Sequence, residues 1–152
     1  MDIGMEKKIA KAFVYPNKQE RFLFELSKKC KDNSSRFPET RLHAICQLER
    51  IIDRRFSFME SMKFPEPQEI IKIMNGYGVK NNCYVLSEYE DYDGVFVDLN
   101  KAVEKLRWNG YSSLIVGLPS GFSHFKGESY ASRQPNFFLK PKNRFDGLPW
   151  GN

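Results

Sequence analysis

The stretch that decides the fold reads SSLIVGLPSGFSHFKGE and covers residues 112–128. It begins with an apolar run, residues 113–116, which is typical of a buried strand. The remainder contains three glycines and one proline, the residue types that end strands and form turns. A rigid strand that leads into a polar loop is a common way to present a functional site. We therefore expect residues 120–128 to form an ordered loop at the end of a sheet, held to the core by Phe122 and Phe125.

Upstream of this stretch, the sequence indicates helices. Apolar residues recur every three or four positions in residues 5–13, 17–31 and 69–75, as expected for helices that bury one face. The longest series predicts a single amphipathic helix over about seventeen positions. Its apolar positions are Leu42, Ile45, Leu48, Ile52, Phe56 and Met59, and the predicted buried stripe is Ile45, Leu48, Ile52 and Phe56.

From residue 82 onward the pattern changes to short strands. Residues 83–86 and 95–97 are apolar and flank an acidic turn that ends in Asp-Gly, which predicts a hairpin. Asp98 is suited to cap a helix over residues 99–106, and residues 137–139 form a last short strand. The segregation of elements predicts an α+β fold, with a helical N-terminal half packed on one face of a small three- to four-stranded sheet formed by the C-terminal half. We expect a single domain over residues 1–140 and an irregular tail over residues 141–152.

The composition bounds the class of protein. The chain has 152 residues, a formal net charge of +5 and three cysteines, Cys30, Cys46 and Cys83. The odd number and wide spacing of the cysteines predict reduced thiols and a cytoplasmic protein. No apolar run approaches the length of a membrane span, so no membrane partner is expected. Residues 65–98 carry seven acidic residues against two basic ones, which predicts a dipolar surface.

The polar residues of the central stretch are the candidates for catalysis. Ser120, His124 and Glu128 include a hydroxyl, an imidazole and a carboxylate, the groups of nucleophilic and proton-transfer chemistry. The glycines around Ser120 do not have the G-x-S-x-G spacing of a nucleophile elbow. His124 could also pair with Asp98 across the sheet, or simply hydrogen-bond to loop backbone.

Metal and phosphate motifs are not evident. His43 and Cys46 are three positions apart and could share a helix face, but further ligands at suitable spacing are missing. Cys46 adjoins the apolar stripe and is interpreted as a core residue. The glycine spacing matches neither a P-loop nor a dinucleotide-binding motif. The sequence therefore predicts no metal site and no cofactor.

Two surfaces are candidates for binding. The acidic turn combines carboxylates, which steer basic partners, with tyrosines, which suit interfaces; it comprises Glu88, Tyr89, Glu90, Asp91, Tyr92 and Asp93. The C-terminal segment interleaves basic and aromatic residues, as single-stranded nucleic-acid binders do. Its members are Arg133, Phe137, Phe138, Lys140, Lys142, Arg144, Phe145 and Trp150.

The absence of a reaction motif favours a non-enzymatic protein that binds another macromolecule, most simply a protein. Small bacterial immunity and antitoxin proteins share this general profile, a comparison at the level of class only. Two alternatives remain open. The first is a small hydrolase or proton-transfer enzyme with its site in residues 117–128. The second is a single-stranded nucleic-acid binder that uses the C-terminal segment. The sequence makes no prediction of oligomeric state.

Overall fold

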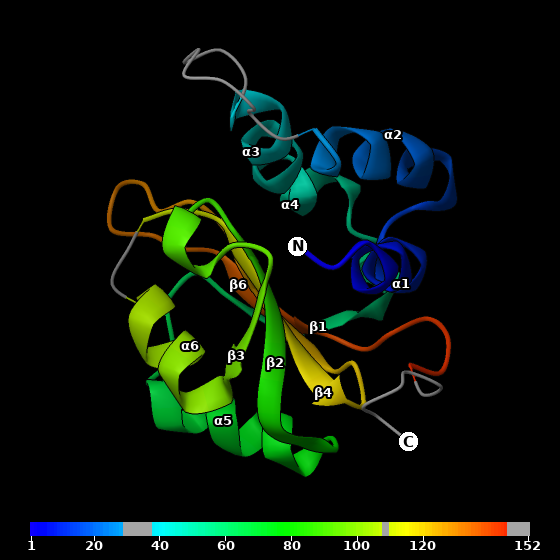
Figure 1. Ribbon diagram of the computed structural model, residues 1–152. Coiled ribbons are helices and arrows are strands. Elements are labelled where there is room, and N and C mark those ends of the chain that lie inside the picture. Colours follow the sequence, from blue (N-terminus) through cyan, green and yellow to red (C-terminus); the bar gives the residue numbers. More distant parts are fainter. Residues whose placement is uncertain (29–37, 108–109, 146–152) are drawn as a thin grey trace.

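The computed structural model describes residues 1–28, 38–107 and 110–145. In this part of the chain, one six-stranded sheet lies between two groups of helices (Figure 1). Every pair of neighbouring strands is antiparallel, and the strand order is β1-β6-β5-β4-β2-β3. The strands are β1 (Ser57–Ser61), β2 (Val79–Ser87), β3 (Val95–Asp98), β4 (Ser113–Pro119), β5 (Ser123–Lys126) and β6 (Asn136–Leu139).

One face of the sheet is covered by the N-terminal helices. They are α1 (Ile3–Phe13), α2 (Pro16–Leu26), α3 (Pro38–Cys46) and α4 (Leu48–Ile51). Asp2 is the N-cap of α1, because its side chain accepts a hydrogen bond from the Met5 amide at 2.8 Å. Apolar side chains from these helices pack on Leu114 and Val116 of β4, which forms one continuous core.

The opposite face is covered by α5 (Pro67–Gly76) and α6 (Leu99–Arg107). Asp98 accepts a hydrogen bond from the Lys101 amide at 3.1 Å and so caps α6, as the sequence predicts. Ile115 points into this second core because side chains along a strand alternate between the two faces. Two short 3₁₀ helices, η1 (Arg54–Phe56) and η2 (Glu90–Tyr92), complete the regular structure.

The α+β class is correct, but the predicted arrangement is wrong. The sheet has six strands rather than three or four, and helices cover both of its faces. Strand β1 comes from the first half of the chain, and α6 comes from the second half. The prediction failed because β4 is apolar on both sides. A strand that alternates between two buried faces needs helices on both, whereas one covering layer was assumed.

The long helix predicted across residues 42–59 is also wrong in its second half. The α-helical structure ends at Ile51, and Ile52 is extended. The extended backbone pairs with the end of α1: the Asp53 amide donates to the Phe13 carbonyl at 2.8 Å, and the Tyr15 amide donates to the Ile51 carbonyl at 3.0 Å. This tertiary pairing replaces the local helical bonds.

The burial predicted for this region is confirmed in part. Ile45, Leu48 and Ile52 are fully buried, as the predicted stripe requires. Phe56 is only half-buried, and Met59 lies exposed in edge strand β1. The apolar spacing therefore identified core positions correctly where the backbone was not the predicted helix.

The loop predicted for residues 120–128 contains strand β5, which pairs with β4 in the register Ile115 to His124. Phe122 and Phe125 are both buried, as predicted, but they enter opposite cores. The predicted hairpin of β2 and β3 is confirmed, and so is the strand at residues 137–139.

Cys46 and Cys83 are free thiols, as predicted, whereas Cys30 lies outside the described residues. Among the helices described, none is both long enough and apolar enough to cross a membrane. Residues 141–145 have no regular structure, but they contact the body: Phe145 is buried, and the Lys142 amide donates to the Ala12 carbonyl at 3.0 Å. The single-domain boundary at residue 140 stays a prediction, and residues 146–152 lie outside the described part.

Candidate functional site

An open groove of about 550 Å³ lies at the turn between β4 and β5, and we call it the turn groove. The turn itself, the end of α5 and the segment after β6 form its walls. This volume is within the range of small-ligand sites. Its lining residues are Tyr77, Pro119, Ser120, Phe122, Lys140, Pro141, Lys142, Asn143, Arg144 and Phe145.

Glycines allow the walls of the turn groove to approach each other closely. Gly121 has φ +83°, and the ring of Phe145 occupies the space where a Cβ would stand. Gly78 has φ +86°, and a Cβ there would lie 3.2 Å from the Cβ of Ser120. Both positions combine a left-handed backbone with close packing, which only glycine meets without strain. The glycine-bearing turn noted in the sequence thus shapes this groove.

The charge of the turn groove is entirely positive among its described lining residues. Lys140 and Arg144 are exposed. Lys142 is partly committed to the fold, because its Nζ donates to the Val14 carbonyl at 2.7 Å and lies 3.6 Å from the buried Asp53 carboxylate. Positive charge gathered on one exposed surface creates a field that attracts anions.

An exposed aromatic ring stands at the edge of the same groove. Tyr77 is 44% exposed, and its ring stacks on Phe122 with a centroid distance of 4.2 Å and an interplanar angle of 3°. Phe122 in turn stacks on Phe138 in the core, at 5.6 Å. Lys140 Nζ lies 5.2 Å from the centre of the Tyr77 ring. One face of the Tyr77 ring is therefore packed against Phe122, while the side chain remains accessible to solvent.

The three candidate catalytic residues are not brought together. Ser120 lines the turn groove, and its Oγ accepts a hydrogen bond from the Phe122 amide at 3.3 Å. Glu128 follows β5 at the other end of the same hairpin, where it contacts Cys46. His124 lies between them, inside the sheet. The fold therefore separates the hydroxyl, the imidazole and the carboxylate.

His124 is a buried residue of the sheet. It is 1% exposed, its Nε2 is 3.2 Å from Asn136 Oδ1, and its ring packs on Phe138 and Phe64. Burial lowers the pKa of His124 to about 4, against a smaller opposing effect of the Asn136 hydrogen bond. The neutral imidazole is therefore a structural hydrogen-bonding group within the sheet, and its ring is shielded from solvent.

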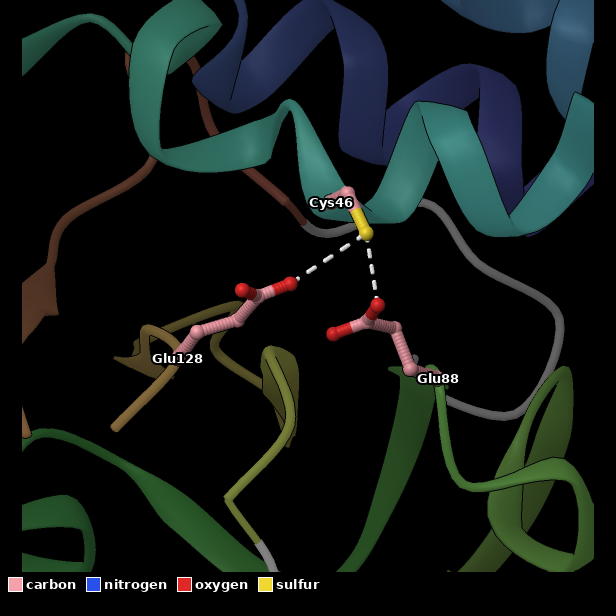
Figure 2. A group of neighbouring side chains, drawn as sticks. All are labelled: Cys46, Glu88 and Glu128. Carbon is pink, nitrogen blue, oxygen red and sulfur yellow. Dashed lines mark hydrogen bonds between the residues drawn. The ribbon is translucent and has the colours of Figure 1, made fainter. Parts of the chain in front are cut away.

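A second cluster joins Glu128 to a residue of the acidic turn (Figure 2). The thiol of Cys46, at the end of α3, donates to Glu88 and to Glu128, the latter at 3.4 Å. Glu88 also accepts a hydrogen bond from the Ser112 amide at 2.7 Å. Two carboxylates that the sequence placed in separate candidate sites thus meet at one cysteine. This cluster lies at the opposite end of β4 from the turn groove.

The chemistry of the Cys46 cluster follows from its protonation. Burial, and then the hydrogen bonds and negative charges of Glu88 and Glu128, raise the pKa of the Cys46 thiol far above its usual range. The sulfur and two carboxylate oxygens lie within 4.8 Å of one another, and such atoms are zinc ligands in other proteins. Zinc binds thiolate, so binding here would first require loss of the thiol proton. The hydrogen bonds account for the geometry as it stands.

Most of the acidic turn serves the fold. Asp93 accepts hydrogen bonds from Arg41, and the rings of Tyr89 and Tyr92 are half-buried against the second core. Glu90 and Asp91 are exposed. Recognition of a protein partner by this turn stays a prediction, and these two carboxylates are the ones placed to meet a partner.

The basic-aromatic C-terminal segment is divided between core and surface. The rings of Phe137, Phe138 and Phe145 are buried, so they offer no face to a ligand. Trp150 lies outside the described residues. The cations Lys140 and Arg144 remain exposed, and both reach the turn groove.

Tyr77 is the residue of this site that the sequence analysis missed. It is separated from the C-terminal segment by about sixty positions, so no local pattern links the two. The available signal was its place between two glycines, Gly76 and Gly78, directly after an amphipathic helix, where an aromatic side chain is presented at a helix end.

Comparisons with protein-family models, with curated proteins and with solved structures give no match to this chain.

Proposed function

We propose that this protein is a non-enzymatic binding protein whose turn groove takes a polyanionic ligand. The observation that carries the proposal is the charge of the groove. Lys140 and Arg144 are exposed there, and none of the described lining residues is acidic. Lysine and arginine side chains on one surface are the usual partners of phosphate groups.

The neutral polar residues of the groove support the same interpretation. Ser120 and Asn143 add hydrogen-bonding groups beside the two exposed cations. A serine without a base does not react as a nucleophile, and the described lining contains no histidine and no carboxylate. Binding therefore accounts for the arrangement of these side chains better than catalysis does.

Isothermal titration of the full chain with short-chain inorganic polyphosphate tests the proposal. We expect binding that weakens steeply as salt increases, because each neutralised phosphate releases counterions. The double variant Lys140→Glu/Arg144→Glu should abolish the interaction. Lys101→Glu/Lys105→Glu is the matched control, since it makes the same change in net charge at exposed positions of α6, outside the groove.

Two results would count against the proposal. The first is wild-type protein that does not bind polyphosphate at low salt. The second is an equal loss of affinity in both double variants, which would show that net charge acts without a specific surface. Circular dichroism of each variant establishes that the fold is retained before affinities are compared.

A further inference from the structure

The ring of Tyr77 gives the turn groove a feature that a simple phosphate site does not need. Its inner face lies flat on Phe122, which is itself stacked on Phe138. The position of Tyr77 is also fixed through the backbone, since its amide donates to the Met74 carbonyl at 3.0 Å. A ring held rigidly from one side loses little conformational entropy when a second flat group stacks on the other side.

Lys140 lies over this ring. Its Nζ is 5.2 Å from the centre of Tyr77 and 5.4 Å from the centre of Phe58. At an exposed site such a cation–π contact contributes only modestly, and stacking of a nucleobase on an aromatic ring is the stronger interaction. A base can therefore displace the ammonium group, which remains on the groove wall and is free to meet a phosphate.

The surroundings of Tyr77 suit a single strand rather than a duplex. A base can stack on a protein ring only when it has left its own stack, as it does in single-stranded nucleic acid. The phosphates that flank the stacked base can then contact Lys140 and Arg144, which line the same groove. The negatively charged phosphates pair with the groove cations, and the flat base stacks on the Tyr77 ring.

We infer that the turn groove binds single-stranded nucleic acid, with one base stacked on Tyr77 and the neighbouring phosphates at Lys140 and Arg144. This inference rests on the proposed polyanion-binding function and names its ligand. It also shifts the aromatic contribution from the buried phenylalanines of the C-terminal segment to the ring of Tyr77, directly after α5.

Fluorescence anisotropy of the full chain with labelled twelve-unit strands tests the inference. The probes are oligothymidylate, oligouridylate and an abasic deoxyribose-phosphate strand of the same charge. We expect one or both base-bearing strands to bind about 5- to 150-fold more tightly than the abasic strand, the fold-change that corresponds to stacking of one base. Comparing the first two distinguishes DNA from RNA as the preferred source.

Variants of Tyr77 separate stacking from charge. Tyr77→Leu should lower the affinity for the base-bearing strand to that of the abasic strand, whereas Tyr77→Phe should keep the full affinity. Tyr130→Leu is the matched control, because Tyr130 is 66% exposed and lies outside the groove lining.

The outcomes are distinguishable. Equal affinity for base-bearing and abasic strands overturns the inference and leaves the polyanion proposal standing. Equal affinity for a duplex of the same length also overturns it. Absence of binding to every strand and to polyphosphate removes both the inference and the proposed function.

Discussion

The guanidinium of Arg41 donates two parallel hydrogen bonds to the carboxylate of Glu6, at 2.9 Å and 2.7 Å, and both side chains are buried. Its remaining donors reach Asp93, at 2.6 Å and 3.2 Å, and the Leu26 carbonyl, at 2.9 Å. All five N–H groups of the arginine are therefore used. These contacts of Arg41 join α3 to α1 and to the turn before β3.

Replacing Arg41 should destabilise the protein strongly. Arg41→Ala removes the only cation paired with the Glu6 carboxylate among the described contacts and leaves Glu6 and Asp93 with neutral donors alone, the Tyr84 hydroxyl and the Ser87 amide. We expect a loss of about 3–5 kcal/mol in the free energy of unfolding. Urea denaturation at neutral pH measures it. Arg21→Ala is the control, since the Arg21 side chain is 80% exposed and its loss should change stability by less than about 0.5 kcal/mol. Similar losses in the two variants would contradict the prediction.

This ion pair illustrates what the sequence could and could not predict. Helix α1 and the β2–β3 hairpin follow from patterns within about fifteen residues, so they were predicted correctly. Glu6, Arg41 and Asp93 are distant in sequence, and each alone has the character of a solvated surface charge. Their pairing depends on the tertiary fold.

The same limit explains the errors in the sheet and in the site. Strand β1 forms because Phe58 pairs with Phe138 across eighty positions, and its sequence alone continued the apolar spacing of a helix. In the turn groove, Ser120 and the cations lay in predicted candidate regions. Tyr77 joins them only because Gly78 packs against the turn at Ser120.

Substitution of Gly121 should both destabilise the fold and disturb the turn groove. Gly121→Ala places a methyl group against the ring of Phe145 in a left-handed backbone conformation, and we expect a loss of about 1–3 kcal/mol in the free energy of unfolding. Polyphosphate affinity should fall as well, because displacement of Phe145 moves Lys140 and Arg144.

Gly76→Ala is the matched control for this prediction. Gly76 is the last residue of α5, and a Cβ there meets no atom within 4 Å, so alanine should be neutral or stabilising. Thermal unfolding and isothermal titration compare the two variants. If Gly121→Ala unfolds at the temperature of the wild type, the close packing of Phe145 on the turn is not needed.

The thiol of Cys46 should react slowly despite its partial exposure. Burial together with Glu88 and Glu128 raises its pKa, so the reactive thiolate is scarce at neutral pH. Alkylation by iodoacetamide, followed by mass spectrometry, should therefore be much slower in the native protein than in the denatured chain. Glu128→Gln removes one negative charge and should accelerate the reaction.

Cys83 provides an internal reference in the same experiment. It is fully buried in β2, so it should stay unmodified while the protein is folded. Modification of Cys83 would reveal unfolding rather than a change in thiolate population. Native Cys46 that reacts as fast as the denatured thiol would refute the assigned hydrogen bonds.

Acid should destabilise the protein through His124 well above the range in which carboxylates titrate. The pKa of this histidine is lowered from 6.5 to about 4 by burial, so between these values the unfolded chain binds a proton that the folded protein does not. Stability is therefore fully present above pH 6.5 and decreases as the pH falls toward 4, by up to about 1.4 kcal/mol for each pH unit. The decrease should amount to about 2 kcal/mol between pH 7 and pH 5.

Chemical denaturation of the wild type and of His124→Gln at these two pH values tests this dependence. The variant cannot take up the proton, so it should lose much less stability on acidification, whatever its stability at pH 7. The Asp53 carboxyl, whose pKa Arg55 lowers to about 2, titrates below this interval and does not interfere. If the wild type and His124→Gln lose equal stability between pH 7 and pH 5, the imidazole of His124 can accept a proton within the folded sheet, and its burial beside Asn136 does not control the acid response.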